Sequence, residues 1–404
     1  MYIFAQKNIL HFCFVLFWSL LLLVACPPLH ANSLPGMGSG DTSSSSDKSN
    51  VPNEVEQALD MLLRDVSGTG TPDRNALLPL LDYARSGVKP AQVRLKARPQ
   101  GPGAYMHATL NVPLQRLLRY CYDPAIPGEA LYPNVLRCSY WLPESQFITS
   151  DVKLWDELEK LADDGQPLVF HGAEFEEITP DVASGCFYSY TLDRLVVLLR
   201  YKGMNTLISV TKQRAPSNVG RVGAIVGQDS DWNYVYSNVE GSNISLAKWA
   251  KTYMYDSANI SIFYETAPGA KTTELAFFKY VRAGWSNMNF VKSTHIAKGA
   301  KRYLDGLRQV LESPRLPQAE AIAEQSRKFR GMDENSLRKA LEPYSARLAA
   351  HANSGPLSAS AFKQMVQEQS YASNLNAKEM GSELIKQYVK EQLGKPPLPA
   401  APTR

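Results

Sequence analysis

Residues 195–212 read LVVLLRYKGMNTLISVTK, two apolar, β-branched runs joined by a Lys-Gly turn at 202–203. A two-residue turn with glycine between runs of this composition predicts a β-hairpin. Residues 259–265 and 272–282 repeat the pattern across an Ala-Pro-Gly turn. Because sequential strands joined by short turns pair antiparallel, the region 186–282 is predicted to form an antiparallel meander.

Aromatic side chains are frequent on the predicted strands, which include 221–228 and the WNYVY run at 232–236. A sheet face of this kind, with a few hydroxyl groups, suits the lining of a ligand pocket. A packed core between sheet and helix needs the same residue types, so both interpretations stay open. The predicted ligand-binding residues are Tyr188, Tyr190, Trp232, Tyr234, Tyr236 and Phe263.

A long helix is predicted to follow the meander, at residues 290–311. Ile296, Ala300, Leu307 and Leu311 recur at helical spacing and give it one apolar side. Such a side must be buried, and the sheet is the nearest apolar surface along the chain. We therefore expect an α+β fold in which the meander wraps a long C-terminal helix.

This order of elements resembles the helix-grip fold of START-like lipid-binding domains over about residues 185–312. The best local likeness is KYVRAGW at 279–285, where the last strand passes through a Gly-Trp corner into the long helix. The resemblance implies a curved antiparallel sheet, an apolar tunnel between sheet and helix, and lipid binding. It assigns no individual ligand residue, because contacts in that family are spread over the tunnel wall.

The remaining segments divide the chain into a domain at 53–312, a helical extension at 315–394 and a disordered, proline-rich tail at 395–404. A first helix begins near Asn53, with Glu56 predicted to complete a capping box. Further helices are expected at 74–86, 114–120, 151–162 and 246–253, and strands at 105–112 and 167–171. In the extension, helices are expected at 318–331, 334–352, 358–370 and 377–393, with apolar faces so thin that they must pack on the main domain or on a partner.

The start of the chain predicts export. Residues 9–25 are nearly all apolar, which is typical of a signal peptide, and we place it at 1–31. The LVAC run at 23–26 resembles a bacterial lipobox that would lipidate Cys26, whereas LHA at 29–31 suits ordinary cleavage, and an uncleaved anchor is a third outcome. The Ser- and Gly-rich stretch 32–52 is expected to be a flexible linker. The predicted location is the periplasm or outer envelope.

Three cysteines remain after such cleavage. Cys121 and Cys138 bracket a turn-rich stretch, and export permits disulfides, so a bridge between them is predicted. Cys186 would then be a buried, small apolar residue.

No strong catalytic motif occurs. Glycine-rich phosphate loops, a nucleophile elbow and a zinc-protease motif are all missing, and no cofactor is expected. The densest polar cluster is His171, Glu174, Glu176, Glu177 and Asp181. Its flanking Gly172 and Pro180 favour a solvated acidic loop over a metal site.

The composition limits the classes of function that we expect. The chain has 404 residues, a net charge of +4 and 20% charged residues, which gives no electrostatic reason to expect nucleic acid. The first hypothesis is an exported protein that binds an apolar small molecule or lipid. The alternative is a non-enzymatic envelope protein that binds a partner through its C-terminal helices. A third is a thiol enzyme built on Cys186 and His171.

Overall fold

The chain is described by a computed structural model. It covers residues 49–150, 152–244, 247–352, 355–359, 362 and 371–398. The predicted signal peptide, the lipidation of Cys26 and most of the linker 32–52 lie outside these residues. None of the helices in the described ranges is both long and apolar enough to cross a bilayer.

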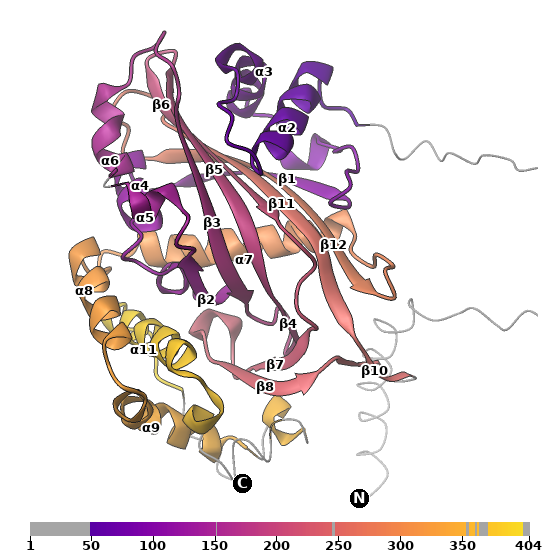
Figure 1. The fold of residues 1–404 in the computed structure, drawn as a ribbon, viewed down its shortest axis with the longest axis vertical. Coiled ribbons are helices and arrows are strands. Elements are labelled where there is room, and N and C mark those ends of the chain that lie inside the picture. Colours follow the sequence, from indigo (N-terminus) through magenta and orange to yellow (C-terminus); the bar gives the residue numbers. More distant parts are fainter. Residues whose placement is uncertain are drawn as a thin grey trace, which may run out of the picture. The chain divides into compact units, whose positions relative to one another are not determined.

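The main sheet is antiparallel throughout and, within the described residues, has seven strands in the order β1-β12-β11-β6-β5-β3-β2 (Figure 1). These are β1 (Gly103–Leu110), β2 (Leu136–Trp141), β3 (Leu168–Ile178), β5 (Ser189–Tyr201), β6 (Met204–Gln213), β11 (Thr252–Tyr264) and β12 (Thr273–Trp285). The predicted α+β class with an antiparallel sheet is confirmed. The early strands β1 and β2 complete the two edges.

Both predicted hairpins are present. β5 pairs with β6 around Lys202 and Gly203, whose φ angles are 53° and 77°. Glycine tolerates that left-handed region without a Cβ clash, which is why this dipeptide turns the chain. β11 pairs with β12 around the turn that contains Gly269, which also has a positive φ.

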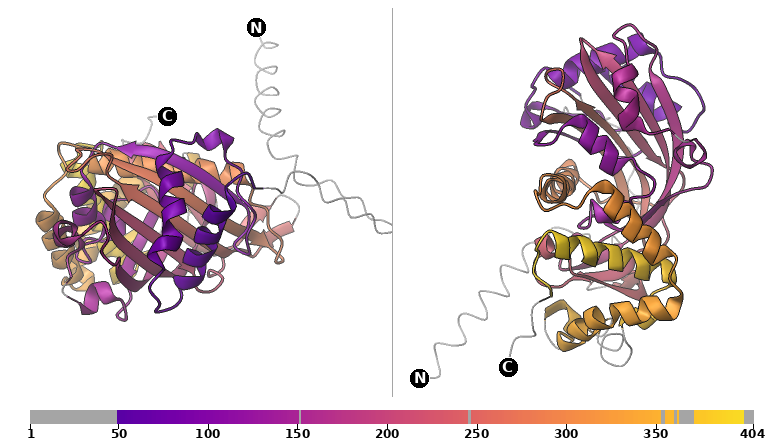
Figure 2. Two further views of the ribbon diagram at one scale, coloured as in Figure 1. Left: turned by 90° about the horizontal axis from the view of Figure 1, so that it is seen from above. Right: turned by 90° about the vertical axis from the view of Figure 1, so that its left-hand side faces the viewer.

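The two faces of the main sheet are covered by different helices. On one face, α2 (Asn53–Asp65) and α3 (Arg74–Arg85) bury every second residue of β5, including Leu195, Val197 and Leu199. On the other face lie α4 (Leu114–Cys121) and the long α7 (Ser293–Leu311). Figure 2 shows α2 and α3 across one side of the sheet, and Figure 1 shows α7 crossing the other. The predicted long helix is therefore confirmed.

The first turn of α2 does not contain the predicted capping box. Pro52 holds the N-cap position and offers no side-chain hydrogen bond. Glu56 instead accepts from Arg98, with 2.5 Å between Oε2 and Nη2, and Arg98 Nε also donates to Asp60 at 2.9 Å. The carboxylate thus ties the helix to the segment before β1 rather than to its own backbone.

A second sheet separates from the predicted meander. Its order is β4-β7-β8 in the described part of the chain, with β4 (Ser184–Phe187), β7 (Arg221–Ile225) and β8 (Tyr234–Glu240). A small hairpin of β9 (Ser242–Ile244) and β10 (Ala247–Ala250) follows. The prediction of a helix at 246–253 is wrong, because residues 247–250 form β10 and β11 begins at Thr252.

The C-terminal helices pack on the rest of the protein. They are α8 (Ala319–Arg330), α9 (Glu334–Ala350) and α11 (Ala377–Gln392), with short 3-10 turns η5 (Gly355–Ser358) and η6 (Tyr371–Asn374). α11 lies against β2 and against the second sheet, where Lys390 Nζ donates to Asn233 Oδ1 at 2.6 Å. By its contacts, Ser46–Arg404 is a single unit, in which the extension shares the main core.

The segment between β2 and β3 is less helical than predicted. The helix expected at 151–162 is reduced to one turn of α6 (Leu154–Glu157) and the 3-10 turn η3 (Leu158–Lys160), after the short α5 (Gln146–Thr149). Two further 3-10 turns, η1 (Pro90–Gln92) and η2 (Gly128–Ala130), flank β1 and β2, and η4 (Asp229–Asp231) precedes β8.

Candidate ligand-binding cavity

A cavity of about 880 Å³ lies between the main sheet and α7. Small-molecule sites are typically about 300 to 1,000 Å³, so the space suits a ligand of drug or lipid size. The sheet supplies the floor, Ile296, Ala300 and Tyr303 of α7 supply one wall, and the segment from Cys121 to Leu136 supplies another.

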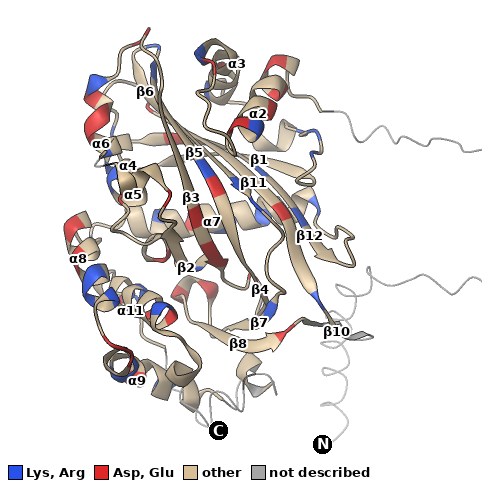
Figure 3. Ribbon diagram, viewed as in Figure 1, with Lys and Arg blue, Asp and Glu red and all other residues tan. Residues whose placement is uncertain are grey.

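The floor is polar because of strand register. Lys279 of β12 pairs with Asn259 of β11, which pairs with Thr211 of β6, which pairs with Arg194 of β5. Residues at paired positions point to the same face, and all four line the cavity. They form a polar row across four strands, and Figure 3 shows acidic and basic residues in the middle of β3 and β5.

A second row across the same strands is apolar. Leu275, Phe263, Leu207 and Leu198 are register partners and are all buried under α4 and α7. Along the strands, the sheet face therefore changes from apolar core to polar floor within four residues. Phe263 of this row lines the cavity together with Phe277 and Ala300, so the gradient gives the cavity an amphipathic lining.

Arg194 forms the fixed ion pair of the floor. Its Nη2 lies 2.6 Å from Glu174 Oε2, and its Nη1 donates to Ser209 Oγ at 2.8 Å. The guanidinium also lies over the rings of Trp141 and Tyr122, at 5.6 and 6.0 Å from their centroids. Burial is the largest single influence and disfavours the charge, but Glu174, Tyr122 and Glu176 together outweigh it and raise the pKa of Arg194.

Glu176 and Lys279 are the two charged groups of the floor without an ion pair. Among the described residues, Lys279 has neither a salt bridge nor a hydrogen bond, and Glu176 accepts a hydrogen bond from the Tyr190 hydroxyl. Burial, followed by the charge of Glu174, raises the pKa of Glu176 to about 7, while Arg194, Lys279 and the Tyr190 hydroxyl oppose that shift. Burial lowers the pKa of Lys279 to about 8, against the attraction of Glu176. The charge of each group therefore shifts the pKa of the other.

The acidic cluster of the sequence is not a loop except at Asp181, which lies in a bend after β3. Residues 171–177 lie within β3, where Glu174 and Glu177 are buried. Alternation on the strand sends Glu174 and Glu176 into the cavity and His171 to the opposite face, where its Nε2 lies 3.1 Å from the Gly70 carbonyl oxygen. In the described part of the chain, no group of three or more His, Cys, Asp or Glu side chains is placed to hold a metal ion.

The proposed thiol pair is not formed. Cys186 lies at the cavity wall and its Sγ accepts from Thr252 Oγ1 at 3.5 Å, whereas His171 faces away from the cavity. Burial also raises the pKa of Cys186, which disfavours a nucleophilic thiolate.

The predicted disulfide is also absent. Cys121, at the end of α4, and Cys138, in β2, are free thiols, and Tyr132 donates to Cys121 Sγ at 3.3 Å. Burial raises the pKa of both thiols to about 12. Cys138 is therefore a small buried side chain, the role that the sequence suggested for Cys186, and Cys121 is a half-buried thiol at the cavity wall.

The six predicted aromatic residues fall into two groups. Tyr188, Tyr190 and Phe263 line the cavity, and their role as ligand contacts stays a prediction. Trp232, Tyr234 and Tyr236 do not line it, because they belong to the core between the second sheet and the C-terminal helices. There Lys395 Nζ lies 4.0 Å from the centre of the Trp232 ring, and Lys386 Nζ lies 5.4 Å from that of Tyr234.

Sequence reasoning missed Arg194 and Lys279 as site residues. Each is a charge inside a largely apolar strand, in LDRLVVLLRY and LAFFKYVRAGW. A charge at a position that alternates with buried residues on both sides is the signal that could have identified them.

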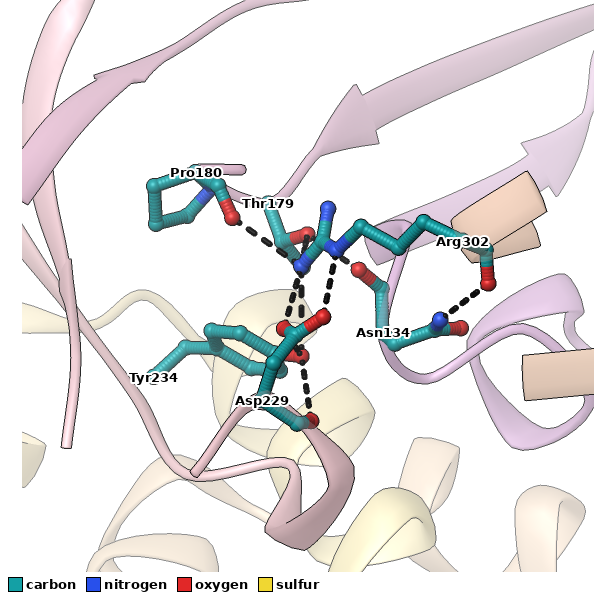
Figure 4. A network of polar contacts seen from close by, with 6 residues as sticks. All are labelled: Asn134, Thr179, Pro180, Asp229, Tyr234 and Arg302. Carbon is teal, nitrogen blue, oxygen red and sulfur yellow. Dashed lines mark hydrogen bonds and ion pairs between the residues drawn. The ribbon is translucent and has the colours of Figure 1, made fainter. Parts of the chain in front are cut away.

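A polar network fixes α7 over the cavity (Figure 4). Arg302 of α7 donates to both Asp229 oxygens at 2.7 Å, to the Pro180 carbonyl at 3.0 Å and to Thr179 Oγ1 at 3.2 Å. The Tyr234 hydroxyl donates to the same Asp229 carboxylate at 2.6 Å. One side chain thus joins the helix to the end of β3 and to the second sheet.

The close approach of α7 requires glycine at position 306. Asn134 donates to the Arg302 carbonyl at 2.6 Å, and a Cβ on Gly306 would overlap that buried amide. We expect Gly306→Ala to lower the free energy of unfolding by about 1–3 kcal/mol through overpacking. The control is Gly299→Ala on the same helix, where a Cβ meets no atom. The higher helix propensity of alanine should raise the free energy of unfolding of this control by about 0.5–1 kcal/mol. Urea titrations of both variants test this, and equal effects would contradict it.

The raised pKa of Glu176 predicts a pH dependence of stability in the ligand-free protein. Because the folded-state pKa of about 7 exceeds the ordinary value of 4.5, the folded state holds this proton more tightly. The contribution of this proton to the free energy of unfolding is fully present below pH 4.5 and is lost as the pH rises through 7. Glu176→Gln should therefore flatten the fall in urea midpoint between about pH 5 and about 7.5. An unchanged fall would contradict this, and Glu324→Gln, on the exposed side of α8, is the control.

Comparison with protein-family models finds no match, and no curated protein matches the chain.

Proposed function

We propose that this protein binds an apolar small molecule or lipid in the cavity between the main sheet and α7. The observation that carries the proposal is a partly open cavity of about 880 Å³, which the side chains of sheet and helix leave unfilled. Well-packed domains leave few voids larger than a water molecule, so a space of this size indicates a ligand site rather than imperfect packing.

The layout also supports a helix-grip-like protein of the START type. A curved antiparallel sheet faces a long helix that follows its last strand, and a cavity separates the two. Two features go beyond that plan: β7 to β10 leave the sheet between β6 and β11, and α2 and α3 cover the far face.

Binding, rather than catalysis, suits the chemistry of the lining. Arg194 and Arg302 are each held by a carboxylate, and the Cys186 thiol has no imidazole partner in the described residues. Uptake would be driven by apolar burial, and about 300 Å² of buried apolar surface contributes roughly 7 kcal/mol before the entropy of association is subtracted.

Ligand entry would use the N-terminal end of α7. Its middle is fixed by Arg302, whereas Ser293, Thr294 and His295 at its start are exposed and Val291 beside them lines the cavity. Movement of this end would open the cavity without breaking the network of Figure 4.

Export is part of the same proposal and is supported by the apolar segment at residues 9–25. The protein would act in the periplasm or at the outer envelope, freely or through a lipid on Cys26. The alternative function, binding of an envelope partner through the C-terminal helices, gains no support from the fold, because Leu337, Leu341, Ile385 and Val389 of these helices are buried within the protein itself.

Filling the cavity from the α7 side should abolish binding. Ala300 is buried and lines the cavity, so Ala300→Phe places a ring where the ligand would lie. We expect the full chain to bind the uncharged probe N-phenyl-1-naphthylamine saturably, and the variant to bind it about tenfold more weakly or not at all. The control is Lys298→Phe, on the exposed side of the same helix. Fluorescence titration measures both, and equal affinities would contradict a site at this position.

A further inference from the structure

We propose that the ligand is an anionic amphiphile whose carboxylate or phosphate head group lies between Lys279 and Glu176. This inference rests on the proposed function and specifies the chemistry of its ligand. Both side chains line the cavity, and both lie on the polar part of the sheet face.

Lys279 is the cation of the floor that is left without a counterion. Arg194 is paired with Glu174 at 2.6 Å and Arg302 with Asp229 at 2.7 Å, whereas Lys279 has neither salt bridge nor hydrogen bond among the described residues. Removing an ammonium group from bulk water without a partner is costly. A bound anion would supply the missing counterion.

Glu176 suits the other side of an anionic head group because it can be neutral there. Its pKa of about 7 means that a proton is available near neutral pH, and a protonated carboxyl donates a hydrogen bond. The charges that face it are Glu174, Arg194 and Lys279, and the neutral Tyr190 hydroxyl donates a hydrogen bond to it. Since Glu174 and Arg194 neutralise each other, an anion near Lys279 would favour the protonated form of Glu176.

The floor between these two groups offers further donors. Asn259 Nδ2 donates to Thr211 Oγ1 at 2.9 Å, which leaves the Thr211 hydroxyl hydrogen for a cavity ligand. Ser209 and Ser261 lie two residues from Thr211 and Asn259 on the same face of these strands and also line the cavity. An anion there would meet hydroxyl groups as well as the ammonium.

The apolar tail has a matching surface at the other end of the gradient. Phe277 lies two residues from Lys279 on β12, and its ring stacks on Tyr303 of α7, with centroids 5.9 Å apart and planes at 9°. Tyr303 also stacks on Tyr132 at 4.8 Å. These rings, with Phe263 and Ala300, form the apolar part of the lining.

The test compares four twelve-carbon ligands on the full chain by calorimetry, below their micelle concentrations: dodecanoate, dodecyl phosphate, dodecanol and dodecyltrimethylammonium. We expect one or both anions to bind about tenfold or more tightly than dodecanol, and the cation most weakly. Whether dodecanoate or dodecyl phosphate binds more tightly identifies the head group.

The variants locate the effect. Lys279→Met should reduce the affinity for the preferred anion to that for dodecanol, and Lys279→Arg should retain the preference. Lys271→Met, in the exposed β11–β12 turn, is the matched control and should change nothing. Glu176→Gln should keep anion binding but remove its loss between about pH 6 and about 8.

Failure of this inference differs from failure of the proposed function. If dodecanol binds in the cavity and charge makes no difference, or if Lys279→Met leaves anion affinity unchanged, the head-group site is wrong while a binding cavity stands. If the cation binds most tightly, the proposed preference of the site for a negatively charged head group is wrong. If none of the four ligands and no uncharged probe binds, the proposed function fails as well.

Discussion

Replacing Arg137 with methionine is expected to lower the free energy of unfolding by about 3–5 kcal/mol, the largest effect of any single change considered for this protein. Arg137 is buried in β2 and pairs with the equally buried Glu177 of β3 and, at 3.0 Å, with Glu379 of α11. Methionine keeps most of the volume but leaves Glu177 buried without its principal counterion.

The aromatic contacts of Arg137 add to this loss. Its guanidinium lies 4.2 Å from the centre of the Tyr236 ring and 5.2 Å from that of Phe187, so it joins the main sheet, the second sheet and α11. Urea titration followed by circular dichroism measures the change. Arg338→Met, which breaks the exposed pair with Glu334 on α9, should cost less than about 1 kcal/mol. If Arg137→Met lowers the free energy of unfolding by a similarly small amount, the contacts of Arg137 do not hold the C-terminal extension in place.

Arg194→Met should cost about 3 kcal/mol and should also change the cavity. The substitution leaves Glu174 and Glu176, two residues apart on one face of β3, without the cation that pairs with Glu174 and attracts Glu176. Their mutual repulsion would raise the pKa of Glu176 further, so the loss of stability should be larger at pH 8 than at pH 5.

A double variant separates lost charge balance from lost packing. Glu174→Gln removes the carboxylate that Arg194 neutralises, so Arg194→Met combined with Glu174→Gln should recover a large part of the stability. Additive losses in the two single variants and the double variant would contradict the role of Arg194 as a counterion. Unfolding free energies at both pH values supply the measurement.

The antiparallel sheet and its closing helix could be predicted because their signals are local. The Lys202-Gly203 turn and the apolar runs around it specify a hairpin without reference to the rest of the chain. The same holds for α7, whose apolar side is visible as a helical period.

The second sheet could not be predicted, because strand pairing across long loops leaves no local signal. Trp232, Tyr234 and Tyr236 have the composition of a pocket lining, but their environment depends on α11, which lies about 150 residues later in the chain. The same limit explains the failed disulfide, since the spacing of Cys121 and Cys138 gives no information on where α4 and β2 place the thiols.

The acidic part of the cavity floor was predicted to be a loop for a different reason. Gly172 and the acidic run after it have the composition of a loop, yet Glu174 and Glu177 are stabilised inside a strand by arginines from β5 and β2. Only the register of β12, β11, β6 and β5 brings Lys279 and Arg194 into one row. Buried charges of this kind are recognised once their partners are known.

The central claim, that the space between the main sheet and α7 holds a ligand, is tested most directly by native mass spectrometry. The full chain would be expressed for export in a bacterium and purified without detergent, and its native mass compared with its mass after denaturation. We predict a bound species of lipid-like mass that leaves on denaturation and is missing from Ala300→Phe. A bare chain that takes up nothing from an added lipid extract would contradict the claim.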